Sequence, residues 1–185
     1  SFGFIKSGID MHWYTPIIIE YNVVLHLHGY IGLIHKFAQC NIPYKELFHI
    51  GGPQTVRGFL FGQIGPVMLG SSLGASRAFF TNAEIQFPIN KAASMNGVLF
   101  YDGGAAWNTI FENPTISKEN LLYSAIENAS VNHLIKNNEI HYRHSVGVGI
   151  RLTAPMPLRI DWAFKLDKRP GESATEVSFS SYYDF

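Results

Sequence analysis

The sequence predicts an all-β protein, a transmembrane antiparallel β-barrel, and three observations predict it. Apolar and polar residues alternate with a period of two along seven segments, as in strands that have two different faces. Charged residues make up only 15% of the chain and aromatic residues 14%, which is typical of a barrel with an apolar outer band and aromatic girdles. The connections between the segments are alternately short and long, as in outer-membrane barrels.

Two strands are predicted at the start of the chain, over residues 2–14 and 17–33, with a turn at Thr15-Pro16 between them. Their apolar side chains share one face: Ile5, Ile9, Met11 and Trp13, then Tyr21, Val23, Leu25 and Leu27. Their polar side chains share the other: Lys6, Asp10 and His12, then Glu20, Asn22, His26 and His28. Successive side chains of a strand point to opposite faces, so this pattern indicates one apolar and one polar face.

Two further strands are predicted over residues 79–88 and 96–107. In the earlier one, the opposed sets are Ala83, Ile85 and Phe87 against Asn82, Glu84 and Gln86. In the later one, they are Leu99, Tyr101 and Trp107 against Asn96, Phe100 and Asp102. Asp102 is therefore predicted on the polar face.

The last three strands, over residues 141–152, 158–166 and 174–185, show the clearest alternation. Their apolar face carries Val146, Val148, Ile150 and Leu152, then Leu158, Ile160, Trp162, Phe164 and Leu166, and finally Val177, Phe179, Tyr183 and Phe185. Their other face carries Gly147, Gly149 and Arg151, then Arg159, Asp161, Ala163 and Lys165, and finally Glu176, Ser178, Ser180, Tyr182 and Asp184. A lysine or arginine facing lipid costs about 2–4 kcal/mol at the midplane, so we expect the charged face to line the lumen.

Strand and connection lengths favour the barrel over a soluble antiparallel sandwich, which would show the same alternation. Several predicted strands match the roughly 9–11 residues of a tilted membrane strand. The short connections are residues 14–16, 89–95 and 154–157, and the long ones are residues 34–78, 108–139 and 167–173. Short turns at the periplasmic end and long loops at the outer end are typical of outer-membrane barrels. No apolar run approaches the roughly 20 residues of a transmembrane helix.

Seven strands do not close such a barrel, because bacterial single-chain barrels have an even number of at least about 8. We therefore expect further strands upstream of Ser1, in agreement with the missing initiator Met and signal peptide. The expected organisation is one unit over residues 1–185, the C-terminal half of a barrel.

Composition excludes several function classes. The 14 basic and 14 acidic residues balance, so no net field would recruit nucleic acid. The single cysteine, Cys40, excludes an internal disulfide and a cysteine-based zinc site. His26 and His28 are interpreted as polar wall residues, not as part of a metal-ligand cluster. No catalytic arrangement stands out, so we expect neither an enzyme nor a cofactor or metal.

The connection over residues 34–78 is long enough to indicate a functional loop. It contains the run Gly-Gly-Pro-Gln-Thr-Val-Arg-Gly-Phe over residues 51–59, whose glycines and proline predict defined turns. Arg57 follows Val56 and precedes Gly58 and Phe59. An arginine on such a rigid tip is suited to a bidentate bond with a fixed carboxylate.

This run resembles the signature of the BamA-type bacterial surface antigen family, which includes the outer membrane protein assembly factor. The family's Val-Arg-Gly-Phe loop motif matches residues 56–59. Its aromatic-x-Asp-x-Gly strand motif matches Phe100, Asp102 and Gly104. Its C-terminal assembly signal matches residues 179–185, through Phe179, Tyr183 and Phe185, although these aromatic residues could also act only as interface anchors.

The resemblance implies a sixteen-stranded barrel preceded by periplasmic POTRA domains, of which this chain supplies the last seven strands. It also implies that the loop at residues 34–78 folds into the lumen, where Arg57 pairs with Asp102. The alternative is that Arg57 packs only against a solvated loop and that Asp102 begins a turn. Gly147 and Gly149 either relieve crowding on a curved wall or make room for the Arg57 tip.

Function is expected at the bacterial outer membrane, as an insertase that assembles other β-barrel proteins. The family resemblance implies lateral opening at the last strand, residues 174–185, and three partners: the lipid bilayer, unfolded outer-membrane clients and accessory assembly lipoproteins. The alternatives are a two-partner-secretion or TamA-like translocation pore and, as a different class, a passive porin. Five POTRA domains would favour the insertase, two the exporter and none the porin.

Overall fold

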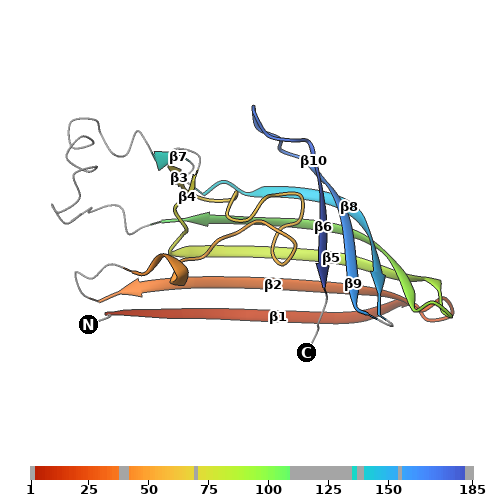
Figure 1. Cartoon of the computed structure of the whole chain (residues 1–185). Helices are drawn as coiled ribbons and strands as arrows, with labels where there is room; N and C mark the ends of the chain where they lie inside the picture. The colour runs from red at the N-terminus through yellow and green to blue at the C-terminus, as the bar shows by residue number, and fades with distance from the viewer. Residues whose placement is uncertain are drawn as a thin grey trace.

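The computed structural model describes residues 3–37, 42–68, 71–108, 135–136, 140–153 and 156–181. Seven strands form one antiparallel sheet in the order β1-β2-β5-β6-β8-β9-β10, each hydrogen-bonded to the next (Figure 1). Their bounds are β1 Phe4–Ile18, β2 Val23–Lys36, β5 Arg77–Asn90, β6 Met95–Trp107, β8 Arg143–Leu152, β9 Leu158–Lys165 and β10 Thr175–Ser181. All seven predicted strands are therefore present, and the sheet is an open, curved wall with β1 and β10 at its edges.

A second, small sheet lies in the long connections, which the sequence analysis treated only as loops. It has the order β4-β3-β7, with β3 at Val67–Met68, β4 at Ser71–Ser72 and β7 at Ile135–Lys136. Strand β7 pairs with β3 and so joins the connection after β6 to the connection after β2. A short 3-10 helix, η1 (Tyr44–Glu46), precedes this sheet. Among the described residues no helix is long and apolar enough to cross a membrane.

The predicted turn at Thr15-Pro16 is wrong. Strand β1 continues through both residues to Ile18, and the turn lies at residues 19–22, where Asn22 has a φ of 52°. Pro16 still pairs with Val24, and the register shifts between Pro16 and Ile18. A proline has no amide hydrogen to donate, and an irregularity near the end of a strand accommodates it. Strand β2 therefore starts six residues later than predicted.

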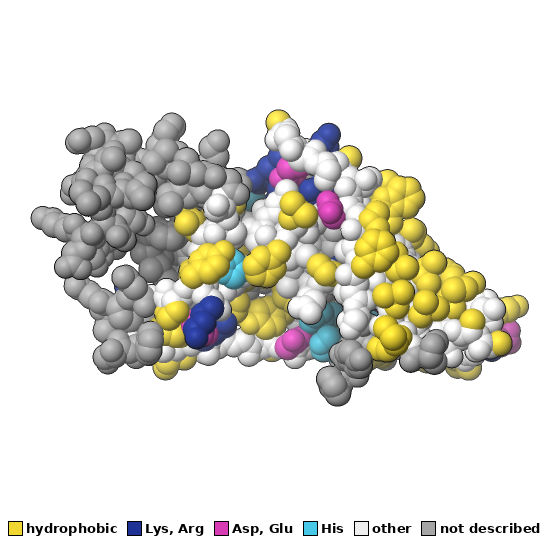
Figure 2. Space-filling model, viewed as in Figure 1, with side chains coloured by type: hydrophobic (Ala, Val, Ile, Leu, Met, Phe, Trp, Pro, Cys, Tyr) yellow, Lys and Arg dark blue, Asp and Glu magenta, His cyan; other side chains and the backbone are white. Residues whose placement is uncertain are grey.

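The two faces of the sheet differ as the alternation predicted. Large exposed apolar side chains lie at the outward positions of every long strand, for example Ile9, Trp13, Leu99, Ile150 and Trp162. Figure 2 shows apolar side chains gathered over β8 and β9. The inward positions next to them carry buried charges. This distribution suits a wall with lipid outside and a polar lumen inside.

The largest buried apolar cluster joins the loop between β2 and β5 to the inner face of the wall. Its buried members are Ile34, Phe48, Ile50, Val56, Phe59, Ile64, Ala75, Ala78, Phe80 and Ala106. Residues from β2, β5 and β6 are in this set, and so are residues of the loop. The loop is therefore packed against the wall, and this packing positions the site.

Candidate functional site

The loop between β2 and β5 is held in a defined shape before it reaches the wall. Antiparallel bridges pair Phe48 with Ala75 and Ile50 with Ile64. At the tip, the Gly51 amide donates a hydrogen bond of 2.8 Å to the Thr55 hydroxyl. Asn82 of β5 donates another of 2.6 Å to the Thr55 carbonyl. Because both ends and the tip are tied, the following residues present their side chains in fixed directions.

Gly58 allows the tip to touch the wall. Its φ of +87° lies in the left-handed region that favours glycine, and a Cβ there would lie 3.0 Å from the Ala163 Cβ and 3.2 Å from the Ser145 Cβ. Ser145 also donates a hydrogen bond to the Arg57 carbonyl. Gly104 has a related role, because a Cβ there would lie 3.1 Å from Val56 Cγ2. The two motif glycines therefore make room for contacts between the loop and the wall.

Arg57 is the centre of the site, and it makes three hydrogen bonds to Asp102. The backbone amide and Nε of Arg57 donate to Asp102 Oδ2 at 3.0 and 2.6 Å, and Nη2 donates to Oδ1 at 2.7 Å. The remaining guanidinium nitrogen, Nη1, donates to Glu84 Oε2 at 2.6 Å. Both predicted partners are fully buried. Such a planar fork is possible for arginine and not for lysine.

The ion pairs continue along the inner wall beyond Asp102. Arg151 donates to Glu84 at 3.2 Å and to Asp161 at 2.7 Å. Arg159 donates to the second Asp161 oxygen. Three arginines and three carboxylates thus balance one another: Arg57, Arg151 and Arg159 against Glu84, Asp102 and Asp161. Buried charges are tolerated when they are paired and hydrogen-bonded in this way.

Phe100 makes a cation–π contact with the Arg57 guanidinium, whose Cζ atom lies 3.5 Å from the centre of the Phe100 ring. Gly147 makes room for that ring, since a Cβ there would overlap Phe100 and the Trp162 carbonyl. Gly149 similarly leaves space for Asp161 and Arg151. Every atom that a Cβ at either glycine would meet belongs to the wall, which agrees with the first of the two roles that the sequence left open, relief of crowding on a curved wall.

Burial and ion pairing act in opposite directions on Arg57. Burial lowers the pKa of its guanidinium, but the attraction and hydrogen bonds of Asp102, with Glu84 and Asp161, raise the pKa by more, so the net shift is upward. Arg57 is therefore permanently charged, and its position depends on the carboxylates. The arrangement is suited to fixing the loop on the wall, and we find in it no nucleophile poised for catalysis.

A second arginine anchors the connection between β9 and β10. Arg143, at the start of β8, donates to Glu172 Oε1 and Oε2 at 2.8 and 2.7 Å and to Asp167 Oδ2 at 2.7 Å. Its guanidinium carbon lies 4.7 Å from the centre of the Phe59 ring, which links this cluster to the loop motif. The hydrogen bonds from Arg143 lower the pKa of Glu172 to about 2, despite partial burial of that carboxyl.

The structure brings most of the predicted site residues together. Val56, Arg57, Gly58, Phe59, Phe100, Asp102 and Gly104 all lie within this one assembly. Phe179 lies elsewhere, on the outward face of β10, with 69% of its surface exposed. Tyr183 and Phe185, the other two predicted members of the assembly signal, lie outside the described residues.

The sequence analysis missed the partners that Arg57 gains beyond Asp102. Glu84 and Asp161 were placed on the polar face but interpreted only as lumen polar residues, and Arg151 and Arg159 were not assigned a role. Alternation gave the correct face for all four residues. Alternation could not show that the register of β5, β8 and β9 brings these four side chains to neighbouring positions along the barrel axis.

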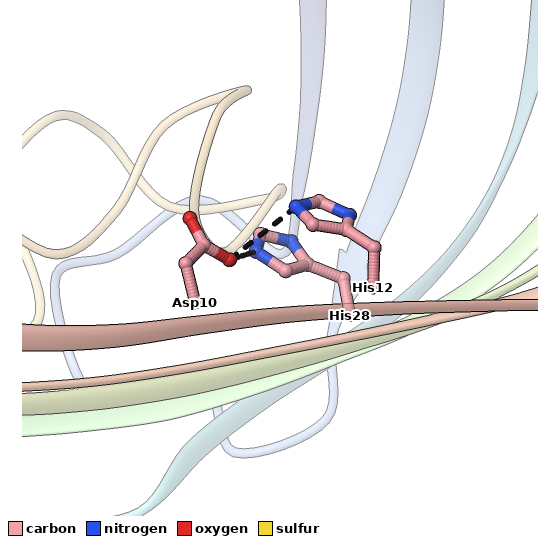
Figure 3. Close-up of side chains that lie close together, drawn as sticks. All are labelled: Asp10, His12 and His28. Carbon is pink, nitrogen blue, oxygen red and sulfur yellow. Dashed lines mark hydrogen bonds and ion pairs between the residues drawn. The ribbon is translucent and has the colours of Figure 1, made fainter.

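A second cluster lies on β1 and β2 and includes His28, one of the two histidines that the sequence analysis interpreted as polar wall residues. Asp10, His12 and His28 each offer a ligand atom, and these atoms lie within 4.8 Å of one another (Figure 3). Alternation alone could not predict this group, because His12 and His28 are sixteen residues apart and become neighbours only through the strand register.

The Omp85 superfamily domain matches residues 1–183 of the chain. The outer membrane protein assembly factor BamA of Neisseria meningitidis serogroup B is 25% identical over 179 residues, covering 90% of this chain and 22% of that protein. The BamA of Nitratidesulfovibrio vulgaris is 27% identical over 173 residues, covering 91% and 19%. The SAM50-like protein CG7639 of Drosophila melanogaster is 32% identical over 80 residues, covering 43% and 18%. The chain thus spans about a fifth of the length of these relatives.

A solved structure has a similar fold. The crystal structure of BamA from Haemophilus ducreyi lacking POTRA domains 1–3 superposes with a TM-score of 0.70 and 19% sequence identity, covering 97% of this chain and 35% of that one. At this identity the likeness concerns the fold alone. It confirms the predicted fold class, an antiparallel barrel wall to which this chain contributes seven strands.

Proposed function

Because this chain belongs to the Omp85 superfamily, as its resemblance to BamA-type proteins predicted, we propose that the whole protein assembles other β-barrel proteins in the outer membrane. The chain itself lies in the bacterial outer membrane, as the sequence predicted. The proposed role is not enzymatic. Its partners are the lipid bilayer, unfolded outer-membrane clients and accessory assembly lipoproteins.

The observation that carries this proposal is the contrast between a firmly anchored loop and a last strand that is paired on one side only in the described sheet. Arg57 holds the loop on β5 and β6 through buried ion pairs. Strand β10, in contrast, pairs with β9 over Thr175–Ser181 and is the last strand of the described sheet. A rigid lumen wall beside an edge strand favours opening at the edge.

An open edge can recruit a client strand through its backbone. The outer edge of β10 is the end of the described sheet, and an edge strand offers unpaired amide and carbonyl groups to an incoming chain. Ser178, Ser180 and Ser181 carry small side chains that offer little surface for packing against a neighbouring strand, which favours a weak seam. Backbone pairing is independent of client sequence, so one edge could serve many clients.

The second candidate is a dedicated exporter of the two-partner-secretion or TamA-like type, in which one substrate passes through the lumen. The same buried loop supports it, because a loop packed on the lumen wall can also regulate a channel. A passive porin is the third candidate. The number of POTRA domains in the whole protein separates them, with five for the insertase, two for the exporter and none for the porin.

The experiment is conditional depletion of the full-length protein, followed by quantification of unrelated outer-membrane barrels and of secreted proteins. The insertase predicts that many barrels decrease together and accumulate unfolded in the periplasm. Complementation with a variant whose seam is closed by a disulfide, between a cysteine at Ser180 and one in the first barrel strand, should fail until the disulfide is reduced.

Two controls make the result decisive. Each single-cysteine variant should complement fully, because it leaves the seam open. Steady barrel levels with the loss of one secreted protein would support the exporter instead. Full complementation by the disulfide-closed variant would contradict lateral opening at β10.

A further inference from the structure

We propose that Asp10, His12 and His28 form a binding site for a divalent transition-metal ion on the inner face of the wall, between β1 and β2. This site is separate from the Arg57 assembly, and it does not depend on the proposed assembly function. Figure 3 shows both imidazole rings directed toward the Asp10 carboxylate.

The strand register places the three ligands together. His12 and His28 are direct partners in the β1–β2 ladder, and side chains at such positions start about 5 Å apart. Asp10 precedes His12 by two residues and shares its face. The Nε2 atoms of His28 and His12 lie 2.7 and 3.3 Å from Asp10 Oδ1. Two ligands of one tetrahedral zinc ion lie about 3.4 Å apart, so small side-chain rotations would suffice.

Neighbouring rings orient the two histidines. The Nδ1 atom of His12 lies 3.0 Å from His26 Nε2, so His12 can donate through Nδ1 and leave Nε2 free as a ligand. Metal-binding histidines commonly make this kind of second hydrogen bond. His26 in turn stacks on Tyr14, with ring centres 4.1 Å apart. The ring of His28 packs edge-on against Phe80 at 5.2 Å.

The ligand set selects the class of ion. Two imidazoles and one carboxylate suit zinc, copper, nickel, cobalt or iron, whereas magnesium and calcium prefer oxygen ligands alone. Three protein ligands also leave at least one coordination position for water. We therefore expect zinc or copper to bind and magnesium to bind much more weakly.

A neighbouring cavity can supply that water. It has a volume of about 60 Å³, and its lining includes His26, His28, Gln54, Arg57 and Glu84. This space is large enough for water molecules and is polar on several sides. An ion bound by His28 would therefore lie next to the loop tip, because Pro53 and Gln54 line the same cavity as His28.

The test is metal binding by the full-length protein, purified in detergent without an affinity tag and stripped with a chelator. Titration calorimetry with Zn²⁺ is compared between the natural protein and the variants His12→Ala, His28→Ala and Asp10→Asn. We expect one tight equivalent of Zn²⁺ that weakens at least about tenfold in each variant. Electron paramagnetic resonance with Cu²⁺ should show coupling to two imidazole nitrogens, and Mg²⁺ should not compete.

The control is His35→Ala, which removes a histidine from the same strand pair but outside the cluster. It should bind Zn²⁺ like the natural protein. Asp10→Asn separates a metal site from a plain hydrogen-bond network, because asparagine still accepts a bond from His28 but is a poor metal ligand. Equal Zn²⁺ affinity in the natural protein and in a His12→Ala/His28→Ala double variant would overturn the proposal, provided that both migrate as folded barrels in unheated gels.

Discussion

Two arginines anchor two different loops, and they do so from opposite sides. Arg57 belongs to a loop and bonds carboxylates of the wall, whereas Arg143 belongs to the wall and bonds carboxylates of a loop. Both side chains are only 2% exposed. Their partners differ, because the Asp102 and Glu84 side chains are 0% and 8% exposed, while those of Glu172 and Asp167 are 14% and 27% exposed.

This difference in burial decides what each anchor can do. A buried pair whose partner is removed leaves an uncompensated charge, which destabilises by about 3–5 kcal/mol. A pair open to solvent is screened and contributes about 1 kcal/mol or less. The Arg57 anchor should therefore be insensitive to salt and mild acid, and the Arg143 anchor should respond to both.

The largest effect is expected for Arg57→Ala. It leaves the buried Asp102 carboxylate without its arginine and Glu84 with Arg151 alone, so we expect the free energy of opening the loop to fall by about 3–5 kcal/mol. Hydrogen exchange of the amides at residues 48–66 in the full-length protein measures this opening. Arg57→Lys should recover only part of the loss, because lysine keeps the charge but cannot form the bidentate fork.

Arg77→Ala is the matched control, since Arg77 is an exposed arginine at the start of β5. It should leave the exchange of residues 48–66 unchanged. If the amides at residues 48–66 exchange at the same rate in Arg57→Ala and in Arg77→Ala, the buried ion pairs do not hold the loop. The contrast between the Arg57 and Arg143 anchors then disappears.

A smaller effect is expected for Gly147→Ala. The new Cβ would overlap the Phe100 ring and the fixed Trp162 carbonyl, so the ring that supports Arg57 must move. Overpacking of this kind costs about 1–3 kcal/mol. We expect thermal unfolding at a lower temperature and faster exchange at the loop tip. Gly29→Ala should be close to neutral, because a Cβ at Gly29 meets no atom within 4 Å, and equal destabilisation by both changes would contradict this role for Gly147.

The smallest effect is expected at the Arg143 anchor, and it depends on pH. The folded pKa of Glu172 is about 2 and its ordinary value is 4.5, because Arg143 favours the carboxylate. The stabilisation is therefore complete above about pH 4.5 and is lost as the pH falls toward 2. The hydrogen-exchange rate of the amides at residues 166–174, corrected for intrinsic rates, should therefore rise as the pH falls from about 4.5 toward 2.

Glu172→Gln should remove most of this pH dependence and weaken the anchor by about 1 kcal/mol or less at neutral pH. High salt should have a similar effect on the natural protein at residues 166–174 and little effect at residues 48–66. A pH response that persists unchanged in Glu172→Gln would assign it to another group.

The sequence predicted the strands well because the pattern of a membrane strand is local. Lipid on one side and a polar lumen on the other impose alternation on neighbouring residues, so Trp162 and Asp161 reveal their faces without any knowledge of the fold. The turn after β1 failed for a related reason. Pro16 is a local turn signal, but its pairing with Val24 in the sheet outweighed that signal.

What the sequence determined by itself was the fold class, the seven strands of the wall and the faces of their side chains, and its resemblance to a known family implied the pairing of Arg57 with Asp102. Only the tertiary structure decided which inward residues meet. Glu84 and Asp161 come together around Arg57 and Arg151, and His12 meets His28, because the strand register and the curvature of the wall set their heights. Alternation fixes a face, but a position along the barrel axis depends on pairing between strands that are distant in sequence.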